Sequence, residues 1–263
     1  MRIPIVGPVP FPINQPFIKT ARSVIRKVQQ QRWPINSTMR HTLVLTWACD
    51  PEPLAAQLPK GLELDPYLAA DGSKYGLMVA NIADVSALSV PGIPQLKTLQ
   101  QVELSYRIAV RHGDEPGHFV WRTLSSNRAA VMGARLALGQ QQEHAEVSVT
   151  ANGDQLRVRA VSESGDADLD LVAHLDRHQL PDDTVFTNVS DARRRGAPSR
   201  RLFSVDAGEL VDLEAESASW TPSPVEVDLS TATLPAAHDG KLSAAVHLAN
   251  TKIVWNPNRL FNR

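Results

Sequence analysis

The sequence contains a single cysteine, Cys49, among 263 residues. One cysteine excludes an intramolecular disulfide and any zinc site built from several thiolates. Because Cys49 follows Trp47 at the end of an apolar stretch, we expect a buried structural thiol rather than a nucleophile. Long apolar runs are also missing: no segment approaches the roughly 18 apolar residues that a membrane-spanning helix requires.

An excess of charge of either sign is missing as well. The 27 basic and 28 acidic residues leave a net charge of −1, so the chain as a whole has no electrostatic attraction for nucleic acid. Residues 1–16 are broken by prolines and lack the continuous apolar core of a signal peptide. We therefore expect a soluble, cytoplasmic protein that binds no nucleic acid and has no transmembrane segment.

The motifs of several large enzyme classes are absent. There is no Gly-x-Ser-x-Gly elbow, no phosphate-binding loop and no dinucleotide fingerprint, and we expect no cofactor. His174 and His178 have the spacing of zinc ligands on a helix, but no third ligand is evident, so we favour exposed polar residues and no metal. The basic cluster Arg193–Arg195 is interpreted as a solvated loop, because no aromatic residues are interleaved with it.

Alternating apolar and polar residues predict a β-rich chain. Asp50 before Pro51 predicts the N-cap of a short helix that ends at Leu58, Asn152-Gly153 predicts a hairpin turn, and residues 162–182 are expected to be acidic and irregular. Short turns and few helices favour a single domain over residues 33–263, closed or nearly closed on itself. The predicted strands are Met39–Trp47, Tyr75–Ile82, Gln101–Arg111, His118–Leu124, Ala145–Thr150, Gln155–Val161, Arg200–Val205, Glu209–Ala218 and Leu242–Trp255.

The N-terminal residues 1–32 differ in character from the remainder. A proline-rich extended arm is followed by a predicted amphipathic helix, Phe17–Arg32, which carries five positive charges and no acid. Two interpretations stay open. The helix docks on its own domain with solvated cations, or it contacts a partner or a membrane surface.

The predicted strand Gln101–Arg111 carries a polar stripe. Its apolar residues alternate with Glu103, Ser105 and Arg107, which therefore point together either into water or into a polar cavity. Arg122 lies on the next strand among bulky apolar residues, so we expect it to be partly buried and to need a partner. Glu103 is the nearest acid in the pattern, and a structural ion pair and a ligand cavity remain equal alternatives.

Several short motifs follow one another along the chain: Arg40–Trp47, Asp50–Glu52, Leu58–Asp65, Val102–Arg107 and Asn127–Leu136. In this order they resemble the YqjF-like family of uncharacterised proteins. The similarity extends from about residue 33 to about residue 225 and includes a more distant similarity to acetoacetate decarboxylase. The resemblance implies an α+β, β-rich fold: a closed, cone-shaped β-barrel with peripheral helices and a polar pocket.

The resemblance also implies roles for individual residues. Arg40 and Glu103 stand where the decarboxylase has a pocket arginine and a pocket glutamate. The lysine that forms the Schiff base in the decarboxylase falls within Gln140–Gln142 here. Glutamine cannot form an iminium, so the Schiff-base mechanism is not expected.

Together these observations predict a polar cavity that contains Glu103 and several arginines: Arg40, Arg107, Arg122 and Arg135. Arginine would hold an anionic small molecule, a carboxylate or oxo compound, and Glu103 would be the catalytic acid or base. One form of this hypothesis is a lyase or isomerase that forms no covalent intermediate. The alternative is a non-catalytic sensor or scaffold whose N-terminal helix contacts a partner or membrane surface. A homo-oligomer stays an open alternative.

Overall fold

The computed structural model describes residues 34–89, 100–131, 142–196, 199–206, 208–217 and 221–259. The arm and basic helix expected over residues 1–32 lie outside this part of the chain, as does Arg135. No helix within the described ranges is long and apolar enough to cross a membrane. The assignment of residues 33–263 to one domain stays a prediction.

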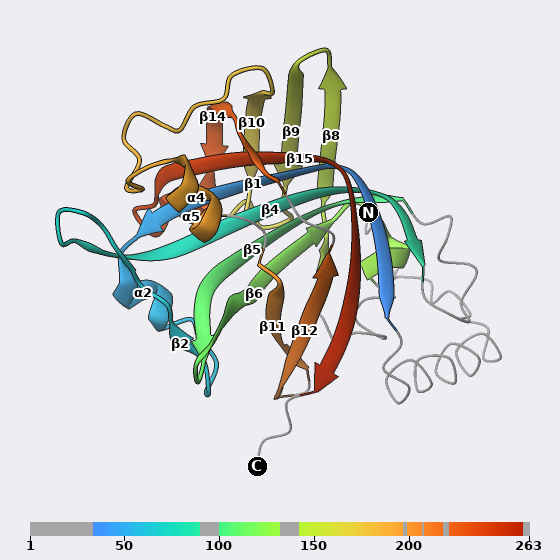
Figure 1. Cartoon of the computed structure of the whole chain (residues 1–263). Helices are drawn as coiled ribbons and strands as arrows, with labels where there is room; N and C mark the ends of the chain where they lie inside the picture. Colours follow the sequence, from blue (N-terminus) through green and yellow to red (C-terminus); the bar gives the residue numbers. More distant parts are fainter. Residues whose placement is uncertain are drawn as a thin grey trace, which may run out of the picture.

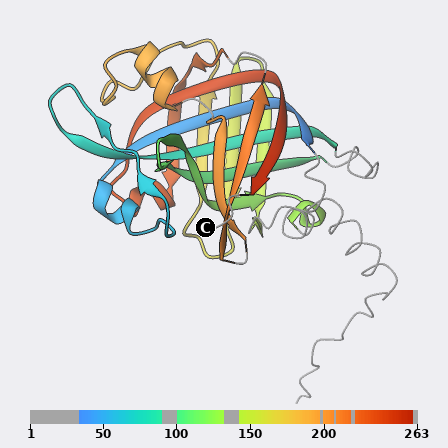
Figure 2. The same cartoon turned by 60° about the horizontal axis from the view of Figure 1, so that its bottom comes forward.

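Seven strands of an eleven-stranded sheet form a hydrogen-bonded ring (Figure 1). Around the ring the order is β5-β4-β1-β15-β12-β11-β6, and β6 pairs back with β5. In Figure 2 the orange β11 and β12 and the red β15 form the near wall, and the blue β1 and teal β4 cross behind them. The expected closed barrel therefore takes the form of this ring. Its strands are β1 (Ile35–Cys49), β4 (Lys74–Ser89), β5 (Gln101–His112), β6 (Glu115–Ser125), β11 (Arg201–Asp206), β12 (Glu209–Ser217) and β15 (Lys241–Arg259).

Four short strands extend the ring at its margins: β2 (Glu63–Leu64), β3 (Tyr67–Leu68), β7 (Gln142–His144) and β13 (Ser223–Pro224). Of these, β7 matters most for the site, because it pairs in parallel with the end of β6. That pairing places Gln142 beside Thr123.

A second sheet of four antiparallel strands packs on the outside of the ring, in the order β14-β10-β9-β8 (Figure 1). The hairpin predicted at Asn152-Gly153 joins β8 (Glu146–Asn152) to β9 (Gln155–Val161), and Gly153 adopts the positive φ of such a turn. The prediction of an irregular segment over residues 162–182 is wrong in part, because these residues include the strand β10 (Leu169–His174). β14 (Glu226–Ala232) pairs with β10 and was not predicted.

Three helices lie entirely within the described residues: α2 (Pro51–Ala55), α4 (Val189–Gly196) and α5 (Thr233–Ala236). Residues 128–131 are helical as well. The predicted N-cap of α2 is confirmed, since the Asp50 side chain accepts a hydrogen bond of 3.0 Å from the Glu52 amide. The prediction of a solvated loop at Arg193–Arg195 is wrong. These cations occupy the last turn of α4, where they oppose the negative end of the helix dipole.

The ring strands have two different faces. One face packs against the second sheet and buries Leu43, Ile82, Leu104, Tyr106 and Ile108 in the main core. The other face turns into the ring and includes smaller apolar clusters, such as Val44, Val79, Val246 and Leu248. We call the side chains of this second set the inward face. Since side chains alternate along a strand, the polar stripe Glu103, Ser105 and Arg107 belongs to the inward face.

Cys49 is buried in the main core, as the sequence predicted. Burial raises the pKa of its thiol to about 12, because the thiolate would lose its hydration. We expect Ellman's reagent to label Cys49 only after unfolding, at a rate that follows denaturant concentration through the unfolding transition. Fast stoichiometric labelling of the native protein would contradict this placement.

Candidate functional site

Polar residues of the inward face meet where β4, β5 and β6 lie side by side. The registers align them in rows across the three strands. Glu103 lies between Ala83 and Ser125, and Ser105 between Asn81 and Thr123. In the next row, Arg107 lies between Val79 and Val120.

The Glu103 carboxylate is surrounded by side-chain amide groups and does not contact a cation among the described residues. Its Oε2 lies 3.5 Å from Nε2 of Gln101 and 3.4 Å from Nε2 of Gln142. Ser125 Oγ orients Gln101 by donating to its Oε1 at 2.9 Å. Burial raises the pKa of Glu103, and the charge of Arg107 and the Gln142 amide only partly oppose that rise.

Arg107 is a buried cation, 5% exposed. Its Nε donates to Ser105 Oγ at 2.8 Å, which turns the side chain along β5 toward Glu103. Burial lowers the pKa of the guanidinium to about 10, and Glu103 opposes this without making an ion pair. No carboxylate among the described residues lies within 4.0 Å of Arg107. A buried charge of this kind normally has a partner.

His118 lies one row beyond Arg107, opposite Ala109. Burial and the nearby charge of Arg107 lower its pKa to about 3, so the imidazole is neutral. Its Nδ1 has no hydrogen-bond partner within the described part of the chain. Three further buried atoms of the inward face share this condition: Thr46 Oγ1, Gln142 Oε1 and Ser204 Oγ. Unpartnered buried polar atoms are rare in folded proteins and call for a water or a ligand.

Arg40 does not lie with Glu103. Its Nε and Nη2 bind the two carboxylate oxygens of Asp84 at 2.8 Å each, and its side chain is 54% exposed. Asp84 pairs across the strands with Val102, so it faces away from Glu103. The expectation that Arg40 and Glu103 share one pocket is therefore not met, because Arg40 already has a carboxylate partner on the outer face.

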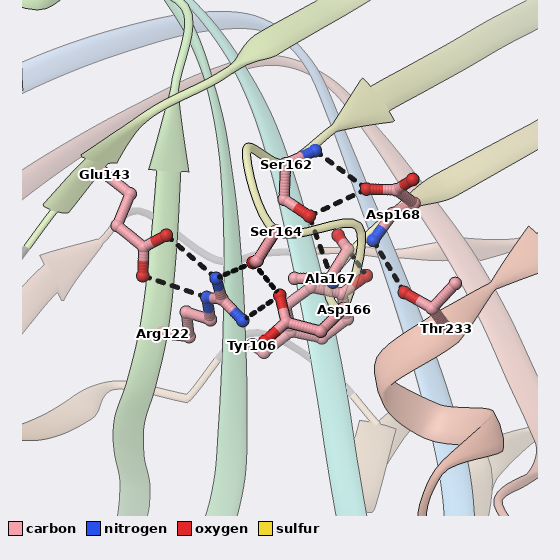
Figure 3. A network of polar contacts seen from close by, with 9 residues as sticks. All are labelled: Tyr106, Arg122, Glu143, Ser162, Ser164, Asp166, Ala167, Asp168 and Thr233. Atoms are coloured by element: carbon pink, nitrogen blue, oxygen red, sulfur yellow. Dashed lines mark hydrogen bonds and ion pairs between the residues drawn. The ribbon is translucent and has the colours of Figure 1, made fainter.

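Arg122 also points to the outer face, since it lies opposite Tyr106. Figure 3 shows its guanidinium between Glu143 and Asp166, and Ser164 Oγ also accepts from it. Two hydrogen bonds of 2.9 and 2.8 Å join it to Glu143, and one of 2.6 Å joins it to Asp166. Arg122 is partly buried and paired, as expected, but its partners are these acids and not Glu103.

The same close-up explains what Arg122 does for the fold. It connects β6 and β7 to the loop between β9 and β10 (Figure 3). In that loop Asp168 accepts from the amide and the hydroxyl of Ser162, both at 2.7 Å. The Asp168 amide donates to Thr233 Oγ1 at 2.8 Å. The network holds the second sheet against the ring and fixes Glu143, the neighbour of Gln142.

His174, Glu226 and Asp228 are close enough together to hold a metal ion. Each of them already has a partner in the protein, however: His174 Nε2 lies 2.8 Å from Asp228, and Arg177 lies 2.6 Å from Glu226. His178 does not join His174, because its Nδ1 contacts the carbonyl of Pro224. His174 is buried, contrary to the expectation of an exposed residue, and we assign no metal there.

Buried neutral histidines make the stability of the fold sensitive to acid. His118 has a pKa of about 3 and His247 one of about 4, the latter because of burial and its neighbour His41 at 3.1 Å. In the unfolded chain each titrates near 6.5. As pH falls from 6.5 the unfolded state binds the extra protons, so stability decreases by up to about 1.4 kcal/mol per pH unit for each histidine. Urea unfolding at pH 7, 6, 5 and 4 measures this slope. The His247→Gln variant should show a smaller slope, and a slope unchanged from wild type would contradict the assignment.

The sequence pattern places Glu103 and Arg107 on one face of a strand, but it does not mark His118, Ser204 and Thr46 as further polar residues of that face. His118 begins a predicted strand that carries bulky apolar residues on both faces. Ser204 and Thr46 occupy the inward positions of β11 and β1. Their hydroxyls carry no motif, so only the register that closes the ring brings them near Arg107.

Comparisons with known proteins agree with this architecture. An acetoacetate decarboxylase from Legionella pneumophila superposes with a TM-score of 0.59 at 14% identity, covering 88% of this chain and 89% of that one. An acetoacetate decarboxylase-like enzyme from Sphingomonas wittichii RW1 gives 0.60 at 15% identity, covering 88% and 94%. The enduracididine biosynthesis enzyme MppR, complexed with pyruvate, gives 0.58 at 10% identity, covering 87% and 90%. These similarities establish a shared fold.

At the sequence level, the uncharacterized protein YqjF of Bacillus subtilis is 24% identical over 208 residues, which is 78% of this chain and 82% of YqjF. The family model DUF2071, described as an uncharacterized conserved protein, matches residues 36–252. That range covers most of the chain, including all of β4, β5, β6, β11 and β12, so the chain belongs to the DUF2071 family and has the acetoacetate decarboxylase-like fold.

Proposed function

We propose that this protein binds a small carboxylate or oxo acid on the inward face of the ring, with Arg107 as the residue that holds the anion. The observation that carries the proposal is the buried guanidinium of Arg107, which has no carboxylate within 4.0 Å among the described residues. A carboxylate would supply the missing partner through two parallel hydrogen bonds. Arg40 and Arg122 are less suited, because each is already paired with protein carboxylates.

The comparison with MppR supports the size of the ligand. That enzyme has the same fold and is complexed with pyruvate, a three-carbon oxo acid. At 10% identity its residues cannot be transferred to this chain. What transfers as a proposal is the class of ligand, a small oxo carboxylate.

Glu103 is the proposed acid or base. Its raised pKa brings proton exchange closer to neutral pH, where such a group is most effective. With a carboxylate on Arg107, a carbon next to a carbonyl group would lie toward Glu103, since the Arg107 side chain extends along β5 in that direction. Glu103 would then remove or return a proton there, which is the chemistry of a lyase or isomerase without a covalent intermediate.

A Schiff-base mechanism has no support. The described lysines Lys60, Lys74, Lys241 and Lys252 are all exposed. Gln142, within the segment where the resemblance places the reactive lysine, contacts Glu103 through its amide. We expect that sodium borohydride in the presence of acetoacetate leaves the intact mass of the protein unchanged. A mass increase at a lysine, mapped by peptide sequencing, would contradict this.

A thermal-shift experiment tests the proposed binding. Acetate and pyruvate should raise the melting temperature of the wild type in proportion to ln(1 + [L]/Kd), whereas the uncharged analogue acetone should not. Arg107→Met should abolish the shift, and Arg40→Ala, a matched loss of an exposed guanidinium, should retain it. Loss in Arg40→Ala with retention in Arg107→Met would reject the assignment of Arg107.

A further inference from the structure

The inward face carries more polar groups than the anion site at Arg107 explains. Thr46 and Arg107 belong to the same row, because Thr46 pairs with Val79 and Val79 pairs with Arg107. On the other side of the ring, Leu202 pairs with His118, and Ser204 lies two residues further along β11 on the same face. Thr46, His118 and Ser204 therefore approach the row of Arg107 from three different strands.

These three residues share an unusual property. Each is at least nine-tenths buried, and Thr46 Oγ1, His118 Nδ1 and Ser204 Oγ have no hydrogen-bond partner in the described part of the chain. A buried hydroxyl elsewhere behaves as expected: Ser243 Oγ donates to the carbonyl of Lys241 at 3.0 Å. Buried polar atoms that lack partners and share one face indicate a bound molecule that supplies the missing hydrogen bonds.

The net charge of the cluster formed by Thr46, His118 and Ser204 limits the ligands that the cluster can bind. His118 is neutral, and the other two residues are hydroxyls, so the cluster has no net charge. Arg107 provides the positive charge beside it and would be matched by one carboxylate. A second carboxylate would lie there without a counter-ion, whereas an uncharged oxygen would gain hydrogen bonds at no electrostatic cost.

We propose that Thr46, His118 and Ser204 form a second polar subsite that binds an uncharged hydroxyl or carbonyl oxygen of the ligand. The inference rests on the proposed function, because Arg107 holds the carboxylate of the same molecule. The ligand class is then a hydroxy or oxo carboxylic acid rather than a plain fatty acid or a dicarboxylate. Neighbouring strands lie about 4.8 Å apart, and β4 separates Thr46 on β1 from Arg107 on β5, so the second oxygen lies several bonds from the carboxylate.

Isothermal titration of matched acids tests the subsite. The probes are butyrate, 4-hydroxybutyrate and succinate, which have the same chain length. Wild-type protein should bind 4-hydroxybutyrate about fivefold or more tightly than butyrate, as one buried hydrogen bond provides, and should not prefer succinate. In Ser204→Ala and Thr46→Val this preference should fall toward one, with the affinity for butyrate unchanged.

The stability of the ligand-free variants gives an independent readout. Removing an unpartnered hydroxyl should leave the melting temperature of Ser204→Ala and Thr46→Val equal to or above that of wild type. Ser243→Ala, which removes a partnered hydroxyl, should melt lower. A retained preference for 4-hydroxybutyrate in both variants, or melting temperatures that fall as in Ser243→Ala, would overturn the subsite and leave the anion site standing. Absence of butyrate binding to wild type would instead contradict the proposed function, and the subsite with it.

Discussion

Replacement of Arg107 by methionine is expected to raise the free energy of unfolding of the ligand-free protein by about 1 kcal/mol or more. The substitution keeps most of the side-chain volume and removes a buried charge that has no carboxylate in ion-pair range within the described residues. The cost of burying that charge is present at every pH below about 10, because the guanidinium stays protonated there. Urea denaturation at pH 7 without ligand measures the gain.

A matched control is Arg122→Met, because Arg122 is also partly buried but is paired with Glu143 and Asp166. That variant should be destabilised, since two acids would be left next to each other without their cation. If Arg107→Met is destabilised as strongly as Arg122→Met, then Arg107 has a structural partner and its role as an anion site is wrong. Stabilisation by one substitution and destabilisation by the other would separate a binding arginine from a structural one.

The second large effect concerns Glu103 and the pH dependence of binding. Ionised Glu103 repels a carboxylate bound at Arg107, so the affinity for acetate should decrease as pH rises through the raised pKa of Glu103. Because burial opposes ionisation in the folded state only, stability should also decrease as pH rises above the ordinary glutamate value of about 4.3. Glu103→Gln should remove the pH dependence of acetate binding and the contribution of Glu103 to the pH dependence of stability, and it should increase stability at pH 7 to 8.

Titrations of acetate between pH 5 and 8 measure the first dependence, and urea unfolding over the same range measures the second. Glu143→Gln serves as control, because Glu143 is exposed on the outer face and pairs with Arg122. An affinity for acetate that changes with pH equally in wild type and Glu103→Gln would show that Glu103 does not face the bound anion.

The polar stripe of β5 could be predicted from the sequence because β5 alternates regularly along its length. The strands β6 and β1 do not alternate regularly. On β6 the register shifts opposite Tyr106 and Arg107, so that Trp121 is an extra residue. Val120 consequently faces inward with Arg107, and Arg122 faces outward. A one-residue bulge reverses every side chain beyond it, and no local pattern in the sequence reports it.

The position of Arg40 has the same explanation. Strict alternation would put it on the inward face with Thr42 and Val44. The register of β1 against β4 shifts between Met39 and Thr42, and Met39 packs inward against Ala83. Arg40 is thereby turned toward Asp84. The fold could be predicted from the strand patterns and the family resemblance. Which side chains face the candidate site, in contrast, depends on two bulges, one on β1 and one on β6.

The most direct test of the account is a crystal structure of the wild-type protein soaked with pyruvate. The account predicts the pyruvate carboxylate inside the ring, within hydrogen-bond distance of the terminal nitrogens of Arg107, with Glu103 near the remainder of the molecule. Pyruvate bound at Arg40 on the outer face would contradict it. So would a ring without pyruvate in which Arg107 and Glu103 form a direct ion pair.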